Sequence, residues 1–379
     1  MRPTDVATAS RSSGEQRFHT LDGLRGVAAL VVVAIHIPAI TGHTLIEGVP
    51  TPPHGMLAVD FFFVLSGFVI ANAYEQRLKR GLGLGAFLRY RIIRLWPLYL
   101  LALGVAVLQF AATRALQANV WTPATLGLMA AATAFMIPLP IFGFHGPVYP
   151  LNPVIWSLAA ELIVNTIYAA IARHLTDRRL VVAWVFFGML LFLAFWLNPH
   201  GSMGLLWQHF HVGLARAAYG FCAGVLAYRI HLRSKGGSGW SGWIFFVMLA
   251  ALLLVPGEAG WRVWYEPLCT LLVFPVMVFF AARSTMGRIG RNVCLTAGTV
   301  SYALYVLHTP LARSFELASK ALHLNTSSSG AGLALLGACV AISWIADVVY
   351  DRPVRRALSR AFPGPSRKAP PPAPKPVPA

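Results

Sequence analysis

The stretch DGLRGVAALVVVAIHIP, residues 22–38, decides the fold class, because it is long and apolar yet carries ionisable groups. An apolar helix needs about 20 residues to cross the hydrocarbon of a bilayer, and this stretch with its flanks supplies them. Asp22, Arg25 and His36 interrupt the run. Such groups are costly in lipid unless they pair or face a cavity. The stretch therefore predicts a membrane helix with a polar, functional face.

The composition of the whole chain has the same character. Of its 379 residues, 57% are hydrophobic and only 12% are charged, whereas a water-soluble domain has about a quarter charged residues. Four cysteines without a Cys-x-x-Cys pair exclude a disulfide-stapled secreted module. His209 and His211 have no third ligand nearby in sequence, so no metal site is expected. The composition predicts an all-α, polytopic integral membrane helical bundle.

The net charge of +18 could point to nucleic acid, but the placement of the basic residues excludes that class. Most lysines and arginines cluster between the apolar runs, for example between Arg77 and Arg94 and from Arg352 onward. Cytoplasmic loops of membrane proteins carry such an excess. We therefore expect a multi-pass protein with both termini in the cytoplasm, and the lipid bilayer as its first partner.

Eleven apolar runs can be counted, and an odd number would place several basic clusters outside the cell. The run at residues 123–141 is the best candidate not to cross, because Pro123 and the Pro138-Leu-Pro140 pair bound it. We predict about ten transmembrane helices plus one re-entrant or interfacial segment. The predicted parts are a cytoplasmic extension (1–20), the membrane domain (21–358) and a proline-rich cytoplasmic tail (359–379).

Polar residues in the first two spans are the first candidates for a site. Arg25 and His36 are eleven residues apart, so they share a helix face at a separation of ~16 Å. His36 can be either a functional imidazole or a hydrogen-bonded core residue. Asp60, in VDFFFVLSGFVIA (59–71), is a candidate partner for it. Ser66-Gly67 in the same run is more typical of helix packing than of a nucleophile.

The third span opens with RIIRLWPLY, in which Arg91 and Arg94 are neighbours on one helix face. They can anchor lipid headgroups, or they can form a bidentate phosphate clamp. In NPVIWSLAAEL (152–162), Asn152 is the expected N-cap of a helix. Ser157 and Glu161 then lie one turn apart, and a carboxylate at that depth is a functional candidate.

Two later segments add polar faces. Arg216 lies in an otherwise apolar run, and GTVSYALYVLHTP (298–310) spaces Ser301, Tyr305 and His308 at i, i+4 and i+7. We treat Ser157, Arg216, Tyr305 and His308 as candidates for substrate contact or structural support.

These motifs, in this order, resemble acyltransferase family 3, the membrane O-acyltransferases that modify bacterial glycans. LDGLRGVAALVVVAIH carries the family's Arg-x10-His spacing, and RIIRLWPLY carries its Arg-x-x-Arg pair. The resemblance runs from Leu21 to about Arg356. It departs from the family at Asp351, where glutamate is common, and no appended hydrolase-like domain follows the last span. A separate extracytoplasmic partner protein is therefore a candidate for completing the transfer.

The resemblance implies a ten-helix enzyme of the bacterial inner membrane. It implies acyl-coenzyme A, with acetyl as the default group, as a donor substrate rather than a tightly bound cofactor, and a glycan or glycoside hydroxyl as acceptor. On this basis Arg91 and Arg94, assisted by Arg25, would hold the phosphates of the donor. His36 would act as general base or take the acyl group, with Glu161 or Asp60 orienting its ring.

Two other classes stay open from the sequence alone. Buried charges across ten helices also describe a transporter or flippase of a glycan precursor, which would form no ester. A membrane scaffold with structural charges is the third class. Ester formation that depends on acyl-coenzyme A separates the first class from both others.

Overall fold

The computed structural model describes residues 17–41, 45, 51, 54–116, 122–140, 143, 145–197, 204–237, 239–255, 259–323 and 329–363. Most of the predicted N-terminal extension and the proline-rich tail beyond residue 363 lie outside these residues.

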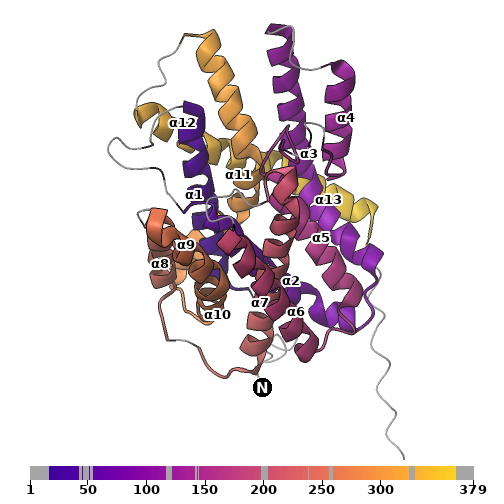
Figure 1. Ribbon diagram of the computed structural model, residues 1–379, viewed down its shortest axis with the longest axis vertical. Coiled ribbons are helices and arrows are strands. Elements are labelled where there is room, and N and C mark those ends of the chain that lie inside the picture. Colours follow the sequence, from indigo (N-terminus) through magenta and orange to yellow (C-terminus); the bar gives the residue numbers. More distant parts are fainter. Residues whose placement is uncertain are drawn as a thin grey trace, which may run out of the picture.

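The described residues form an all-α bundle and contain no β-strand (Figure 1). The α-helices are α1 (His19–Thr41), α2 (Leu57–Lys79), α3 (Leu84–Leu116), α4 (Pro123–Ala134), α5 (Ile155–Ile171), α6 (Asp177–Leu197), α7 (Phe210–Arg233), α8 (Gly242–Leu254), α9 (Ala259–Leu268), α10 (Phe274–Ala282), α11 (Arg288–Ala321), α12 (Ser329–Ile345) and α13 (Arg352–Ala361). A 3₁₀ turn, η1 (Trp207–His209), precedes α7, and two π-helical turns, η2 (Cys269–Val273) and η3 (Ala346–Asp351), join α9 to α10 and α12 to α13.

Seven helices in the described part of the chain are long and apolar enough to cross a membrane. They are His19–Pro38, Leu57–Lys79, Leu84–Thr113, Asp177–Leu197, Trp207–Arg233, Val263–Ala282 and Gly330–Ala361. The polytopic bundle is thus confirmed, whereas ten crossings remain a prediction. The 34-residue α11 and the shorter apolar helices α5 and α8 are the elements that would supply the other three.

Helix α4 is the segment predicted not to cross. It contains 12 residues, a length of about 18 Å, whereas the hydrocarbon layer is about 30 Å thick. It begins where the sequence favours a start, since the hydroxyl of Thr122 accepts a hydrogen bond from the Thr125 amide and Pro123 takes the first position.

The expected N-cap role of Asn152 is wrong. Helix α5 begins three residues later, at Ile155, and no side chain caps it. The Asn152 side chain is fully buried and donates a hydrogen bond to the carbonyl oxygen of Val306, at 3.0 Å. The side-chain amide of Asn152 therefore bonds to α11 instead of capping α5, as the sequence alone had predicted.

Two pairs of helices form the centre of the bundle, α1 against α11 and α2 against α7 (Figure 1). Glycines allow the second pair to approach closely. A Cβ atom on Gly67 would lie 2.1 Å from the carbonyl oxygen of Phe221, and one on Gly224 would lie 2.0 Å from that of Val64. The packing role predicted for Gly67 is therefore confirmed.

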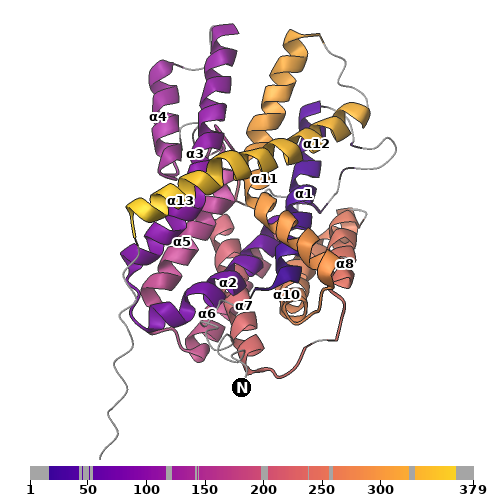
Figure 2. The same ribbon diagram turned by 180° about the vertical axis from the view of Figure 1, so that it is seen from behind.

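Helices α12 and α13 continue through η3 as one long element that runs obliquely across the back of the molecule, over α3 and α11 (Figure 2). Its π turn holds Asp347 and Asp351, both almost fully buried. Arg352 pairs with Asp347 at 2.6 Å, and Arg355 pairs with Asp351 at 2.8 Å. These ion pairs stabilise the junction of η3 with α13 from within the element, whereas contacts of η3 and α13 with α3 place it behind the helix that carries Arg94.

Candidate active site

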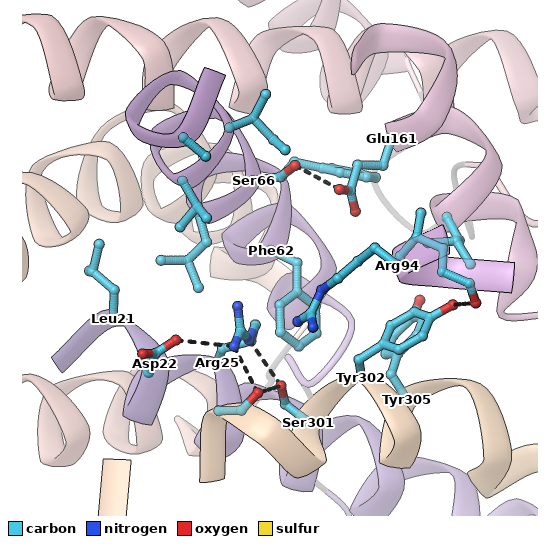
Figure 3. A pocket seen from close by; sticks show the side chains of 18 of the residues that line it. Leu21, Asp22, Arg25, Phe62, Ser66, Arg94, Glu161, Ser301, Tyr302 and Tyr305 are labelled. Carbon is cyan, nitrogen blue, oxygen red and sulfur yellow. Dashed lines mark hydrogen bonds and ion pairs between the residues drawn. The ribbon is translucent and has the colours of Figure 1, made fainter. Parts of the chain in front are cut away.

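A cavity of about 500 Å³ lies among α1, α2, α3, α5 and α11 (Figure 3). It reaches solvent at the N-terminal end of α1, where the Arg17 side chain is 55% exposed. The cavity is layered. The order of the lining residues along their helices defines three levels. The mouth includes Phe18, Asp22, Asn72 and Gly298. The middle layer holds Arg25, Ser66, Arg91, Arg94, Glu161 and Ser301, and the inner end holds Val59, Phe62, Phe63, Leu95, Leu158 and Tyr305.

Arg25 is held rigidly in the middle layer. Its Nε atom donates to the Ser301 hydroxyl at 2.9 Å, and one terminal nitrogen donates to the Gly298 carbonyl at 2.7 Å and to Asp22 at 3.1 Å. The other terminal nitrogen makes no hydrogen bond to a described residue. Arg25 therefore presents a fixed donor toward the cavity (Figure 3).

Glu161 collects three donors on one oxygen. Its Oε1 atom accepts hydrogen bonds from Ser66 at 2.7 Å, from Arg91 at 2.8 Å and from Asn165 at 3.3 Å. No described residue donates to Oε2. Arg91 is thereby neutralised by a carboxylate, and the second carboxylate oxygen remains available to a ligand.

Arg94 is the unpaired cation of the cavity. Among the described residues it has no hydrogen-bond or ion-pair partner, and its exposed side chain lines the cavity. Figure 3 shows it reaching into the space between Phe62 and Glu161. The positive charges of Arg25 and Arg91 repel that of Arg94, and the carboxylate of Asp351 attracts it. This middle layer is suited to an anion or a polarised carbonyl.

Ser157 and Tyr305 close the inner end. Their hydroxyl groups lie 2.5 Å apart, and the Tyr305 ring packs edge-on against Phe62 with ring centres 5.6 Å apart. Ser157 also donates to the Val154 carbonyl at 3.1 Å.

His36 and His308 form a pair behind this inner end. Their rings meet edge-to-face with centres 4.9 Å apart, and His308 lies one turn beyond Tyr305 on α11. The Nδ1 atom of His36 lies 2.7 Å from the Val32 carbonyl oxygen, which can only accept, so Nδ1 carries the proton and Nε2 is the free base. His36 does not line the cavity.

The carboxylates expected to orient His36 are elsewhere, so that expectation is wrong for both. Asp60 forms a bidentate pair with Arg216, at 2.8 and 2.6 Å, with both side chains buried and Arg216 above the Trp156 ring. Glu161 is bonded to Arg91. Each carboxylate has a guanidinium as partner, and the backbone of α1 orients the imidazole instead.

The structure thus brings Arg25, Arg91, Arg94, Glu161, Ser157 and Tyr305 to one cavity, with His36 and His308 beyond it and Asp60 and Arg216 apart from it. Sequence reasoning noted Asp22 without giving it a role in the site, and it missed Asn165. Both had a signal, because Asp22 lies three residues before Arg25 and Asn165 four after Glu161, on the same helix faces. Within the described residues, no cluster of three or more His, Cys, Asp or Glu side chains could hold a metal ion.

Comparison with known proteins identifies the family of the chain. The family model described as "Acyltransferase domain" matches residues 18–348. "Protein 2 in picA locus" of Rhizobium radiobacter is 34% identical over 192 residues, which cover 48% of this chain and 96% of that protein. "Acyltransferase MdmB" of Streptomyces mycarofaciens is 30% identical over 177 residues, 43% of this chain and 42% of that one. No solved structure matches.

Proposed function

Because the chain belongs to acyltransferase family 3 and is a membrane-embedded acyltransferase, we propose that it moves a short acyl group, acetyl by default, from acyl-coenzyme A to a glycan hydroxyl. The donor comes from the cytoplasm and the acceptor from the opposite side of the inner membrane, and both termini are cytoplasmic. The observation that carries the proposal is the cavity in which Arg94 has no described partner, next to the His36–His308 pair.

The donor is held by the cations of the middle layer. Arg94 and the free terminal nitrogen of Arg25 bind its phosphate oxygens, since guanidinium groups suit phosphate geometry. Arg91 contributes less to phosphate binding than the sequence suggested, because it already forms an ion pair with Glu161. The glycan acceptor and any separate extracytoplasmic partner protein meet the enzyme at the opposite end of α1.

The proposed reaction transfers the acyl group from the thioester sulfur of the donor to the hydroxyl oxygen of the acceptor. His36 Nε2 takes the proton of the acceptor hydroxyl, whose oxygen attacks the thioester carbonyl carbon. The carbon–sulfur bond breaks, and the coenzyme A thiolate leaves and receives the proton from the imidazolium. Alternatively Nε2 attacks the carbonyl carbon itself and expels the coenzyme A thiolate, and the imidazole holds the acyl group until the acceptor oxygen takes it and the hydroxyl proton passes to the thiolate. In either route, the Val32 carbonyl keeps Nδ1 protonated and Nε2 basic.

The test is mass spectrometry of surface glycans from cells that carry the intact gene, a deletion, or His36→Ala. A mass increment present only with the intact protein identifies the acyl group and the acceptor. If glycan abundance changes while no ester disappears, the proposal fails and the transporter class replaces it.

A further inference from the structure

The arginines line the cavity, His36 does not, and a wall of two aromatic rings, Phe62 and Tyr305, lies between them. Along α1, Arg25 lines the cavity while His36, about 16 Å further along the helix, does not. Between these two levels α2 inserts the Phe62 ring and α11 inserts the Tyr305 ring, in edge-to-face contact. A donor whose phosphates rest on the arginines therefore faces this wall before it reaches the imidazole.

Different contacts hold the two rings of the wall in place. The Phe62 ring is only partly buried, and it packs against apolar clusters that contain Val32 and Val33 of α1. Tyr305 is held by its hydroxyl contact with Ser157 and by a longer one, 3.3 Å, with the Val154 carbonyl. On the side of Tyr305 away from the cavity, its ring lies next to the His308 ring, with centres 6.1 Å apart, and the His308 ring contacts the His36 ring. Phe62 and Tyr305 are thus the side chains that separate the cavity lining from the histidine pair.

We propose that Phe62 and Tyr305 form a gate, the Phe62–Tyr305 gate, which closes the arginine cavity from the His36–His308 pair and is parted by the reactive arm of the donor. The role of the donor rests on the proposed function, whereas the closed gate does not. The distance along α1 supports this role, because the reactive arm of a donor anchored at Arg25 has to extend through the gate to meet His36. A closed gate also keeps water and ions from passing between the two sides when no donor is bound.

The test places a thiol behind the gate and approaches it from the cavity side. His36→Cys is prepared with the native Phe62 and with Phe62→Ala, in inside-out membrane vesicles. Each is treated with a charged, membrane-impermeant methanethiosulfonate, and the unsubstituted protein serves as the blank for its four native cysteines. With native Phe62 the new thiol should react slowly. With Phe62→Ala it should react about tenfold faster or more, because access limits the rate.

Two controls keep the result specific. Val69→Ala enlarges the same cavity away from the gate and should leave the rate at the native value. Ser66→Cys, on the cavity side, should be labelled with either residue at position 62, which shows that Phe62→Ala has folded. If Phe62→Ala fails to fold, Tyr305→Phe keeps the ring, removes the hydroxyl contact with Ser157 and should raise the rate. Equal rates at position 36 with and without Phe62 overturn the gate.

A second reagent tests passage of the donor arm. Coenzyme A disulfide should form a mixed disulfide with the His36→Cys variant at native Phe62, as the thiolate introduced at position 36 attacks one sulfur and expels coenzyme A thiolate. Arg94→Ala should abolish this product, and glutathione disulfide should not form its counterpart. If the gate opens to the methanethiosulfonate in Phe62→Ala but coenzyme A disulfide never reacts, the donor assignment is overturned and the gate stands.

Discussion

Arg91 donates a hydrogen bond to Glu161 at 2.8 Å, while Arg94, three residues along the same helix, has no hydrogen-bond partner among the described residues. Two arginines of one motif thus have different electrostatic roles. The carboxylate of Glu161 neutralises the first and locks it in place. The second keeps its charge available to a ligand, so the two positions should respond differently to substitution.

Arg94→Ala should weaken the binding of coenzyme A by about 10- to 100-fold, the value of one to two charge-assisted hydrogen bonds. Titration of coenzyme A into the detergent-purified protein measures the loss. Arg233→Ala, at an exposed arginine outside the cavity, is the matched control and should bind as the native protein does. If Arg94→Ala and Arg233→Ala lost affinity equally, the loss would come from the lower net charge of the protein and not from a specific contact at Arg94.

His36→Ala should lower acyl transfer by about 10²- to 10⁴-fold, the usual contribution of a general base, and leave coenzyme A affinity unchanged. The residue lies outside the cavity that holds the donor phosphates, so binding and chemistry should separate. Glycan ester content and coenzyme A titration provide the two readouts. His174→Ala, at an exposed loop histidine, is the control and should retain native acyl transfer and native coenzyme A affinity. If His36→Ala still transfers the acyl group, the imidazole has no part in the mechanism.

Asp60→Asn should destabilise the protein by about 3–5 kcal/mol, since it leaves Arg216 buried without its bidentate partner. Thermal unfolding in detergent measures this change. The double variant Asp60→Asn with Arg216→Met should recover part of the loss, because it removes both charges. A catalytic Asp60 would instead give a stable, inactive single variant, with no recovery in the double one.

Gly67→Ala should destabilise the packing of α2 on α7 by about 1–3 kcal/mol, because the added methyl group meets the backbone oxygen of Phe221. Gly104→Ala is the matched control, since a Cβ atom at Gly104 meets nothing within 4 Å. That substitution should be neutral or stabilise α3 by up to about 1 kcal/mol. A comparison of the two unfolding temperatures decides whether the effect is steric.

The sequence predicted the helical membrane class and gathered most of the cavity, because hydropathy and i, i+4 spacing are local properties. It could not predict which charge pairs with which. Asp60 and Arg216 are 156 residues apart, and their contact depends on the close packing of α2 and α7. The same limit explains Asn152, whose partner lies on α11. Nothing in the sequence distinguished Phe62, because a phenylalanine within a run of three phenylalanines is typical of a buried core position.

The π turn at Ala346–Asp351 fixes the register of the chain's last described helix. A π turn accommodates one residue more than an α turn, so deletion of one residue between Asp347 and Asp351 would restore regular winding and leave the following helix with the same orientation. Arg352 would then lie four residues after Asp347 instead of five, a spacing at which an α-helix also brings two side chains together. Insertion of one more residue would instead turn α13 by about 100° and take Arg352 and Arg355 away from Asp347 and Asp351. The segment should therefore tolerate the loss of one residue but not the gain of one.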